Sequence, residues 1–142
     1  AVNYLFNFKT QSIPGGAFVE NEGTTAQNGQ FRYRTNLRLG YDMSAIGLGL
    51  TWQHLPSVRN SAYATAPTTT LQGADAYDLF NLDAHWNVRT SVAVRFGVDN
   101  LLDKAPLVYG ANVGLTQALG STLPNYYDVL GRRYYAGVKL TL

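Results

Sequence analysis

Ionisable side chains recur at every second position in several stretches of this 142-residue chain. Arg32, Arg34 and Arg38 alternate with uncharged residues, and Asp83 and His85 stand two positions apart. A spacing of two places side chains on one face of a β-strand. We predict such a polar face from Arg32, Arg34, Arg38, Asp83, His85, Arg95, Asp99 and Lys139. Its excess of cations would attract an anionic solute or pair with carboxylates elsewhere in the protein.

The Asp83–His85 spacing would also suit two ligands of one metal ion. Two ligands do not make a site, however, and the chain has no Cys and no further His near them in sequence. We therefore interpret His85 as a hydrogen-bonded side chain on the polar face. The sequence predicts no metal site and no cofactor.

No pattern typical of catalysis accompanies these residues. The sequence contains no nucleophile elbow, no phosphate-binding loop and no carboxylate pair with a plausible cleft. Gly47 and Gly49 lie in an alternating stretch, where glycine eases curvature or the close approach of another group. We therefore expect a protein that is not an enzyme.

Aromatic and amide side chains gather in the segments between the alternating stretches. Rings that stack and amides that donate hydrogen bonds are typical of sites for neutral sugars or aromatic solutes. The alternative is a set of loops that pack on themselves and cover a cavity. The candidate solute contacts are Tyr63, Tyr109, Asn112, Gln117, Tyr126 and Tyr127.

The composition excludes several classes of protein. Charged residues make up 14% of the chain, against about 25% in average soluble domains. No run of about 20 apolar residues exists, so a helical membrane protein is excluded. Fourteen Gly and ten Tyr at a slightly negative mean hydropathy suit alternating strands. No signal peptide is visible before the first alternating stretch, so we expect a mature protein or a piece of a longer one.

The hydrophobic pattern predicts an all-β, antiparallel protein. Period-two alternation marks strands at residues 1–9, 31–41, 45–54, 77–88, 90–100 and 133–142. The connections alternate between short turns and long polar loops at 10–30, 55–76 and 101–132. Each strand has one apolar face on which we find no charge, whereas charges occur on nearly every opposite face.

This pattern favours strands that cross a membrane. A charge at the bilayer midplane costs roughly 2–4 kcal/mol, so its absence from successive faces is informative. Short turns opposite long loops are the asymmetry of outer-membrane barrels, which have periplasmic turns and extracellular loops. We expect a periplasmic C-terminus, with rim aromatics at the outer interface (Phe31, Tyr33, Trp52, Tyr134) and at the inner one (Tyr41, Trp86).

Two segments near the C-terminus carry a family resemblance. Tyr135, Gly137, Leu140 and Leu142 resemble the β-signal read by the bacterial barrel-assembly machinery, although Leu142 stands where an aromatic residue is usual. The stretches Phe96–Lys104 and Tyr127–Val138 resemble the C-terminal end of TonB-dependent outer-membrane receptors. That family usually has Phe at the position of Leu102.

The resemblance implies that residues 1–142 are the C-terminal portion of a receptor barrel of about 22 strands, without its plug domain and earlier strands. It further implies TonB-driven uptake of a scarce solute, of the ferric siderophore or oligosaccharide class. The implied partners are the remainder of the receptor, the TonB complex, the assembly machinery, outer-membrane lipid and the solute, with no nucleic acid.

Two alternatives compete with this hypothesis. The first is a self-contained small outer-membrane barrel with a structural or adhesive role, which would require further strands hidden in a loop because the smallest such barrels have about 8. The second is a soluble ligand-binding barrel whose apolar faces point inward. The watery character of the charged faces argues against the second alternative.

Overall fold

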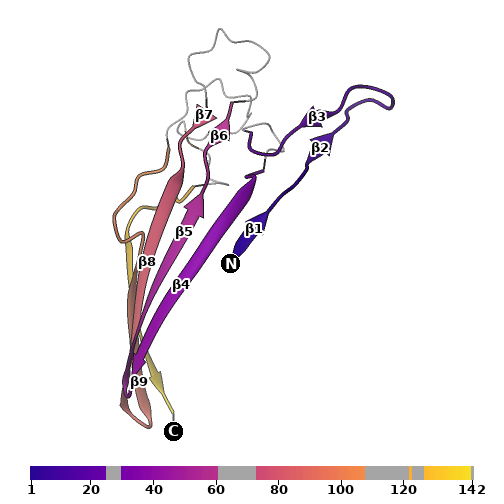
Figure 1. Cartoon of the computed structure of the whole chain (residues 1–142). Helices are drawn as coiled ribbons and strands as arrows, with labels where there is room; N and C mark the ends of the chain where they lie inside the picture. Colours follow the sequence, from indigo (N-terminus) through magenta and orange to yellow (C-terminus); the bar gives the residue numbers. More distant parts are fainter. Residues whose placement is uncertain (25–29, 61–72, 108–121, 123–126, 142) are drawn as a thin grey trace. The chain divides into compact units, whose positions relative to one another are not determined.

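The computed structural model describes residues 1–24, 30–60, 73–107, 122 and 127–141. Every regular element among these residues is a β-strand (Figure 1). The strands are β1 (Val2–Tyr4), β2 (Lys9–Thr10), β3 (Val19–Glu20), β4 (Tyr33–Met43), β5 (Ile46–Leu55), β6 (Val58–Arg59), β7 (Gly73–Ala74), β8 (Tyr77–Arg89), β9 (Val92–Asp99) and β10 (Arg133–Leu140). Among the described residues, no helix is long and apolar enough to cross a membrane.

Six of the strands form one antiparallel sheet in the order β1-β4-β5-β8-β9-β10. The two hairpins β4–β5 and β8–β9 turn over at two residues each, and Ser44 takes a positive φ of 50° in the first turn. β1 and β10 are the edges, so the sheet is open rather than closed as a barrel. The predicted all-β antiparallel fold is confirmed; membership of a larger barrel stays a prediction.

The first strand is shorter than expected. Residues 1–9 were predicted as one strand, but β1 pairs with β4 only from Val2 to Tyr4. The chain then leaves the sheet after one more hydrogen bond, from Leu5 N to Arg32 O. Lys9 and Thr10 pair instead with β3. Alternation continues through residues 5–9 in the sequence, but it reports only which way side chains point, not which strand they pair with.

The loops 10–30 and 55–76 each contain a short hairpin that the sequence did not indicate. β2 pairs with β3, and β6 pairs with β7 (Figure 1). Each strand has two residues, which is too short to show a periodic pattern. In the third long loop, 101–132, the described residues form no strand, as predicted.

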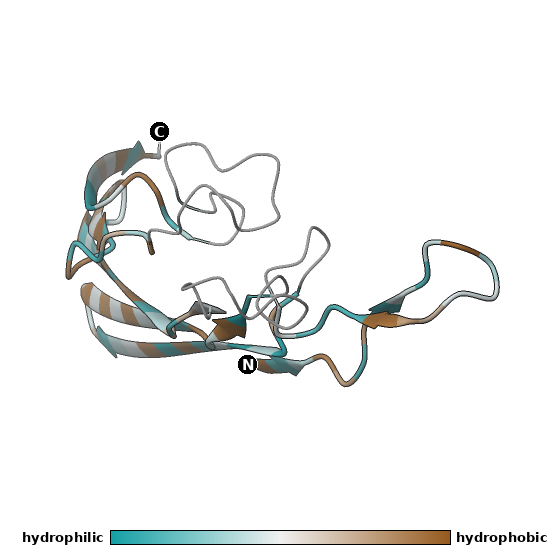
Figure 2. Ribbon diagram, turned by 90° about the horizontal axis from the view of Figure 1, so that it is seen from above, coloured by the Kyte–Doolittle hydropathy of each residue, from teal (hydrophilic) through white to brown (hydrophobic). Residues whose placement is uncertain are grey.

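The registers of β8, β9 and β10 sort the side chains into matching rows. Leu82 pairs with Val98, which pairs with Tyr134; Trp86, Val94 and Val138 form a parallel apolar row. Ala84, Phe96 and Ala136 form a third apolar row between these two. The rows of the opposite face contain polar or small residues, and the long strands show the alternation as bands of colour (Figure 2). The predicted division of each strand into two faces is confirmed for these three strands.

The apolar side chains of the six-stranded sheet are more exposed than is usual for the interior of a protein. Leu48 on β5 is 50% exposed and Val138 on β10 is 65% exposed. Further large apolar side chains of the same faces are exposed on every long strand, among them Leu37, Leu39, Tyr41, Ile46, Leu82, Trp86, Phe96, Tyr134 and Leu140. Soluble monomers rarely expose contiguous apolar surface of this kind without a use for it.

The contacts divide the described chain into two units. The first unit comprises Ala1–Thr35, His54–Tyr77 and Pro106–Val129, and it holds most of the buried side chains. Tyr77 is fully buried and its ring meets that of Tyr127 edge-on at 5.0 Å between centroids. Phe31 meets Tyr127 at 6.3 Å, and the Arg34 guanidinium lies 5.1 Å from the Phe31 ring. These contacts form an aromatic core.

The burial of Phe31 corrects one prediction. The period-two alternation placed Phe31 on the apolar face of the second predicted strand, at the outer rim. Instead it precedes β4, is 4% exposed, and lies in the aromatic core. The backbone is not extended in strand pairing before Tyr33, so the alternation that assigns faces does not apply to Phe31.

The second unit comprises Asn36–Gln53, Asp78–Ala105 and Leu130–Leu142. In this unit, a tight turn after β9 is fixed by hydrogen bonds of Asn100. Asn100 has a positive φ of 53° and is 1% exposed. Its side chain accepts a hydrogen bond from Lys104 N at 2.8 Å and donates one to Lys104 O at 3.0 Å. Its backbone N–H donates to Asn81 Oδ1 at 2.8 Å.

The same turn holds the start of the last strand. Asp103, which also has a φ of 53°, accepts a hydrogen bond on Oδ1 from Arg132 N at 3.0 Å. Gly131 has a φ of 70°, a conformation that glycine adopts without strain. Asp99 and Arg133 then form an ion pair at 3.6 Å. The segments Asn100–Lys104 and Gly131–Arg133 are thus joined by direct contacts.

Candidate functional site

The polar face of the second unit is the candidate site, and glycines in β5 organise it. The Arg38 guanidinium on β4 reaches across β5 to the Asp83 carboxylate on β8, with 2.9 Å between Nη2 and Oδ2. A Cβ on Gly49 would stand 2.6 Å from Asp83 Oδ1. Glycine at this position therefore leaves the space in which the two charges meet over the intervening strand.

A second pair crosses β5 one row further along. His85 Nε2 on β8 lies 3.7 Å from Asp42 Oδ1 on β4. A Cβ on Gly47 would overlap both the His85 ring and the Asp42 carboxylate. The two glycines thus permit close approach, the second of the roles expected for them. The partly exposed Arg38–Asp83 pair contributes about 0–1 kcal/mol, and the His85–Asp42 contact is an ion pair only when the imidazole is protonated.

A third glycine lies beneath a side chain of the last strand. Tyr135 on β10 covers Gly97 on β9, and a Cβ on Gly97 would overlap the tyrosine hydroxyl. The same Cβ would stand 2.7 Å from the Leu82 carbonyl oxygen of β8. A side chain hydroxyl can move aside, but a backbone oxygen within a paired strand cannot move without displacing the strand.

Gly97→Ala is therefore expected to lower the free energy of unfolding by about 2 kcal/mol, the typical cost of overpacking. Guanidinium unfolding of the purified full-length protein measures this change. Gly40→Ala is the matched control, because the nearest heavy atom to its Cβ is Leu48 O at 4.0 Å. Identical unfolding midpoints for the two variants would contradict the close approach.

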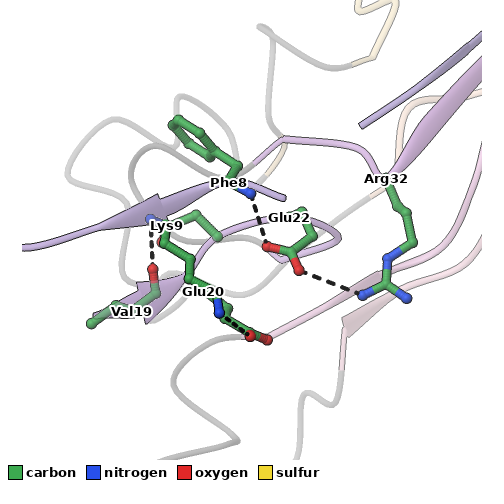
Figure 3. A network of polar contacts seen from close by, with 7 residues as sticks. Phe8, Lys9, Val19, Glu20, Glu22 and Arg32 are labelled. Carbon is green, nitrogen blue, oxygen red and sulfur yellow. Dashed lines mark hydrogen bonds and ion pairs between the residues drawn. The ribbon is translucent and has the colours of Figure 1, made fainter. Parts of the chain in front are cut away.

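The predicted polar-face residues divide between the two units. Arg38, Asp83, His85, Arg95, Asp99 and Lys139 lie on the polar face of the second unit. Arg32 and Arg34 belong to the first unit, where Arg34 lies over Phe31. Arg32 is 3.8 Å from Glu22, which also accepts a hydrogen bond from Phe8 N (Figure 3). Glu22 lies in a predicted loop, so the sequence offered no signal for this pairing.

Lys9 and Glu20 form a further ion pair at 3.1 Å between β2 and β3 (Figure 3). It belongs to the first unit and stands directly opposite in the hairpin register. Both side chains are exposed, so this pair fixes the hairpin only weakly.

The predicted β-signal residues have distinct surroundings. Tyr135 covers Gly97, and Gly137 lies beneath the Arg95 side chain, whose Nε would be 3.2 Å from a Cβ at that position. Leu140 is exposed on the apolar face. Leu142 lies outside the described residues. Recognition by the assembly machinery stays a prediction.

Most of the predicted loop contacts cannot be placed. Tyr127 is 3% exposed and packs against Tyr77 and Phe31, so its ring is accounted for by the aromatic core. The remaining candidates, Tyr63, Tyr109, Asn112, Gln117 and Tyr126, lie outside the described residues.

Asp78 corrects the expectation that no strand has a charge on its apolar face. β8 begins at Tyr77, and Asp78 has the parity of Phe80 and Leu82. The Trp52 indole N–H donates a hydrogen bond to Asp78 Oδ1 at 2.8 Å. The carboxylate stands at the second residue of the strand, where its charge meets a donor. The exception is therefore confined to the strand's beginning.

A related polar contact joins aromatic residues in the first unit. Tyr33 Oη and His54 Nε2 are 3.4 Å apart, and their rings stack with 5.8 Å between centroids. Tyr4 stacks on Tyr33 from the neighbouring strand at 6.5 Å. His54 was not predicted to take part in any site, since a lone histidine at a strand end has no recognisable pattern.

Chemically, the polar face offers paired charges and further cations. Among the described residues no three His, Cys, Asp or Glu side chains gather as they would around a metal ion. Comparisons of the chain with models of protein families, with curated proteins and with solved structures found no match. The function must therefore be argued from the two faces of the sheet.

Proposed function

We propose that this chain is the C-terminal barrel segment of a TonB-dependent receptor in a bacterial outer membrane. The observation that carries the proposal is the exposed apolar face of the long strands, on which Leu48, Phe96 and Val138 are each at least half exposed. Lipid covers such a face at a gain of about 25 cal/mol per Å² of apolar surface. In a soluble protein the same face would need another protein layer.

The opposite face supports a position toward a watery lumen. Arg38 pairs with Asp83 across β5, His85 lies close to Asp42, and these side chains remain in contact with solvent. Transmembrane barrels alternate in this way, apolar toward lipid and polar toward the interior. A soluble barrel with its apolar faces inward would instead place these polar contacts on its outer surface.

The polar partners of aromatic residues support the interfacial rim. Tyr33 with His54, and Trp52 with Asp78, each combine an apolar ring with a hydrogen bond from its polar end. Amphipathic rings of this kind are enriched where the hydrocarbon layer meets the headgroups. Both pairs stand near the ends of β4, β5 and β8 from which the long loops depart.

In this proposal the segment supplies wall, lumen face and part of the outer vestibule of a larger barrel of about 22 strands. Import of a ferric siderophore or an oligosaccharide would draw on TonB-derived energy through a plug contributed by the rest of the receptor. The barrel-assembly machinery would insert the chain with its C-terminus in the periplasm and the long loops outside.

Heat modification of the protein in outer membranes tests the proposal. An epitope tag placed within residues 61–72 of the intact gene product is expected to appear in the outer-membrane fraction. On a gel, it should migrate faster unboiled than boiled, at a mass several times that of 142 residues. A heat-shifting band near the chain's own mass would instead identify a self-contained small barrel. A soluble band that does not shift would contradict a membrane location.

A further inference from the structure

The charges on the polar face of the second unit are unevenly matched. Asp42, Asp83 and Asp99 each face a basic side chain, namely His85, Arg38 and Arg133. Arg95 and Lys139 are on the same face, but among the described residues neither forms an ion pair. The basic residues on β9 and β10 therefore leave two positive charges without a carboxylate.

The sheet register brings these two charges together. Arg95 pairs with Gly137 and Lys139 pairs with Ala93, so Arg95 and Lys139 are diagonal neighbours on β9 and β10. Diagonal neighbours on one face stand about 7–8 Å apart. The Arg95 side chain also extends over Gly137, toward the strand that carries Lys139. Two like charges on neighbouring residues repel each other, and an anion bound between them would relieve that repulsion.

The space between the two cations is open and has a small floor. A hollow of about 520 Å³ is lined by His85, Ala93, Arg95, Gly137 and Lys139 of this face and by the alternate residues Val94, Val138 and Leu140. Ala93 contributes little side-chain volume, so a bound group can approach the backbone there, whereas the Arg95 side chain covers Gly137. The volume falls within the range of small-molecule sites, roughly 300–1,000 Å³. Arg95 presents a planar fork suited to carboxylate and phosphate, and Lys139 adds a compact point charge.

We propose that Arg95 and Lys139 anchor a soluble small molecule that carries at least two carboxylate or phosphate groups. A molecule with two such groups satisfies both cations at once, because each oxyanion can take one of them as its partner. His85 is occupied by Asp42 at the far wall and limits the site on that side. This proposal rests on the proposed function in one respect: the barrel would orient this face toward the path that a solute takes.

The test is equilibrium binding of citrate, which has three carboxylates, to the purified full-length protein in low salt. We expect saturable binding that weakens as NaCl is raised, and acetate, a monocarboxylate, should bind at least tenfold more weakly. Arg95→Gln and Lys139→Gln should each lower citrate affinity about fivefold, because each removes a charge-assisted contact. Inorganic phosphate, a compact anion, should bind more weakly than citrate.

The controls are Arg133→Gln and Lys9→Gln, which remove the same charges from positions already paired with Asp99 and Glu20. Both should bind citrate within about twofold of wild type. Equal affinities in all four variants would overturn the assignment. So would binding that appears only after Arg95→Gln and Lys139→Gln, which would reveal a carboxylate of the protein itself in the site. A gel result against the membrane location leaves this binding result standing, so the two failures are distinguishable.

Discussion

Leu48→Arg is expected to remove most of the protein from the outer membrane. Leu48 is the third residue of β5, on the exposed apolar face. An arginine on a lipid-facing strand costs from about 1 kcal/mol near the interface to about 2–4 kcal/mol at the bilayer midplane. That amount is a large part of the stability of an ordinary folded protein. Quantitative blotting of outer-membrane fractions for the full-length protein measures the loss.

Thr51→Arg is the matched control for this prediction. Thr51 stands on the same strand but on the polar face, so the same side chain would enter a watery environment. We expect outer-membrane levels within about twofold of wild type. Equal levels of the Leu48→Arg and Thr51→Arg proteins would contradict the assignment of the apolar face to lipid. Loss of both would mean that β5 tolerates no arginine on either face.

Asn100→Ala is expected to lower the free energy of unfolding by about 3 kcal/mol. The substitution removes the two hydrogen bonds that the buried Asn100 side chain makes with the backbone N–H and C=O of Lys104. Each lost hydrogen bond contributes about 0.5–1.5 kcal/mol. Alanine at a positive φ adds roughly 1 kcal/mol, because the left-handed region suits asparagine better. Denaturant unfolding of the purified full-length protein measures the change.

Two companion variants separate these contributions. Asn100→Gly keeps the favourable φ but loses the side chain, so it should recover about 1 kcal/mol relative to alanine. Asn100→Asp keeps the acceptor for Lys104 N but sets a charged oxygen against Lys104 O at a buried position. We expect Asp and Gly both to be less stable than Asn, and Gly to be more stable than Ala. If alanine and wild type unfold at the same denaturant concentration, the turn does not hold β9 to the last strand.

The sequence by itself located the long strands and their two faces. Alternation in residues 77–88 and 90–100 predicted β8 and β9 nearly to their bounds, because each face of these strands has a uniform environment. The same logic placed Arg38, Asp83, His85 and Lys139 on the polar face. It failed at Phe31, where the chain is not yet a paired strand and parity carries no meaning.

The sequence did not predict which residues the charged side chains pair with. Arg38 and Asp83 are 45 positions apart, and only the order β4-β5-β8 brings them together over Gly49. Likewise the register of β9 with β10 decides that Arg95 and Lys139 are neighbours without a carboxylate. Alternation is a local property with a period of two, so it determines the face of each side chain. Pairing depends on which strands align and in which register, and tertiary structure alone decides that.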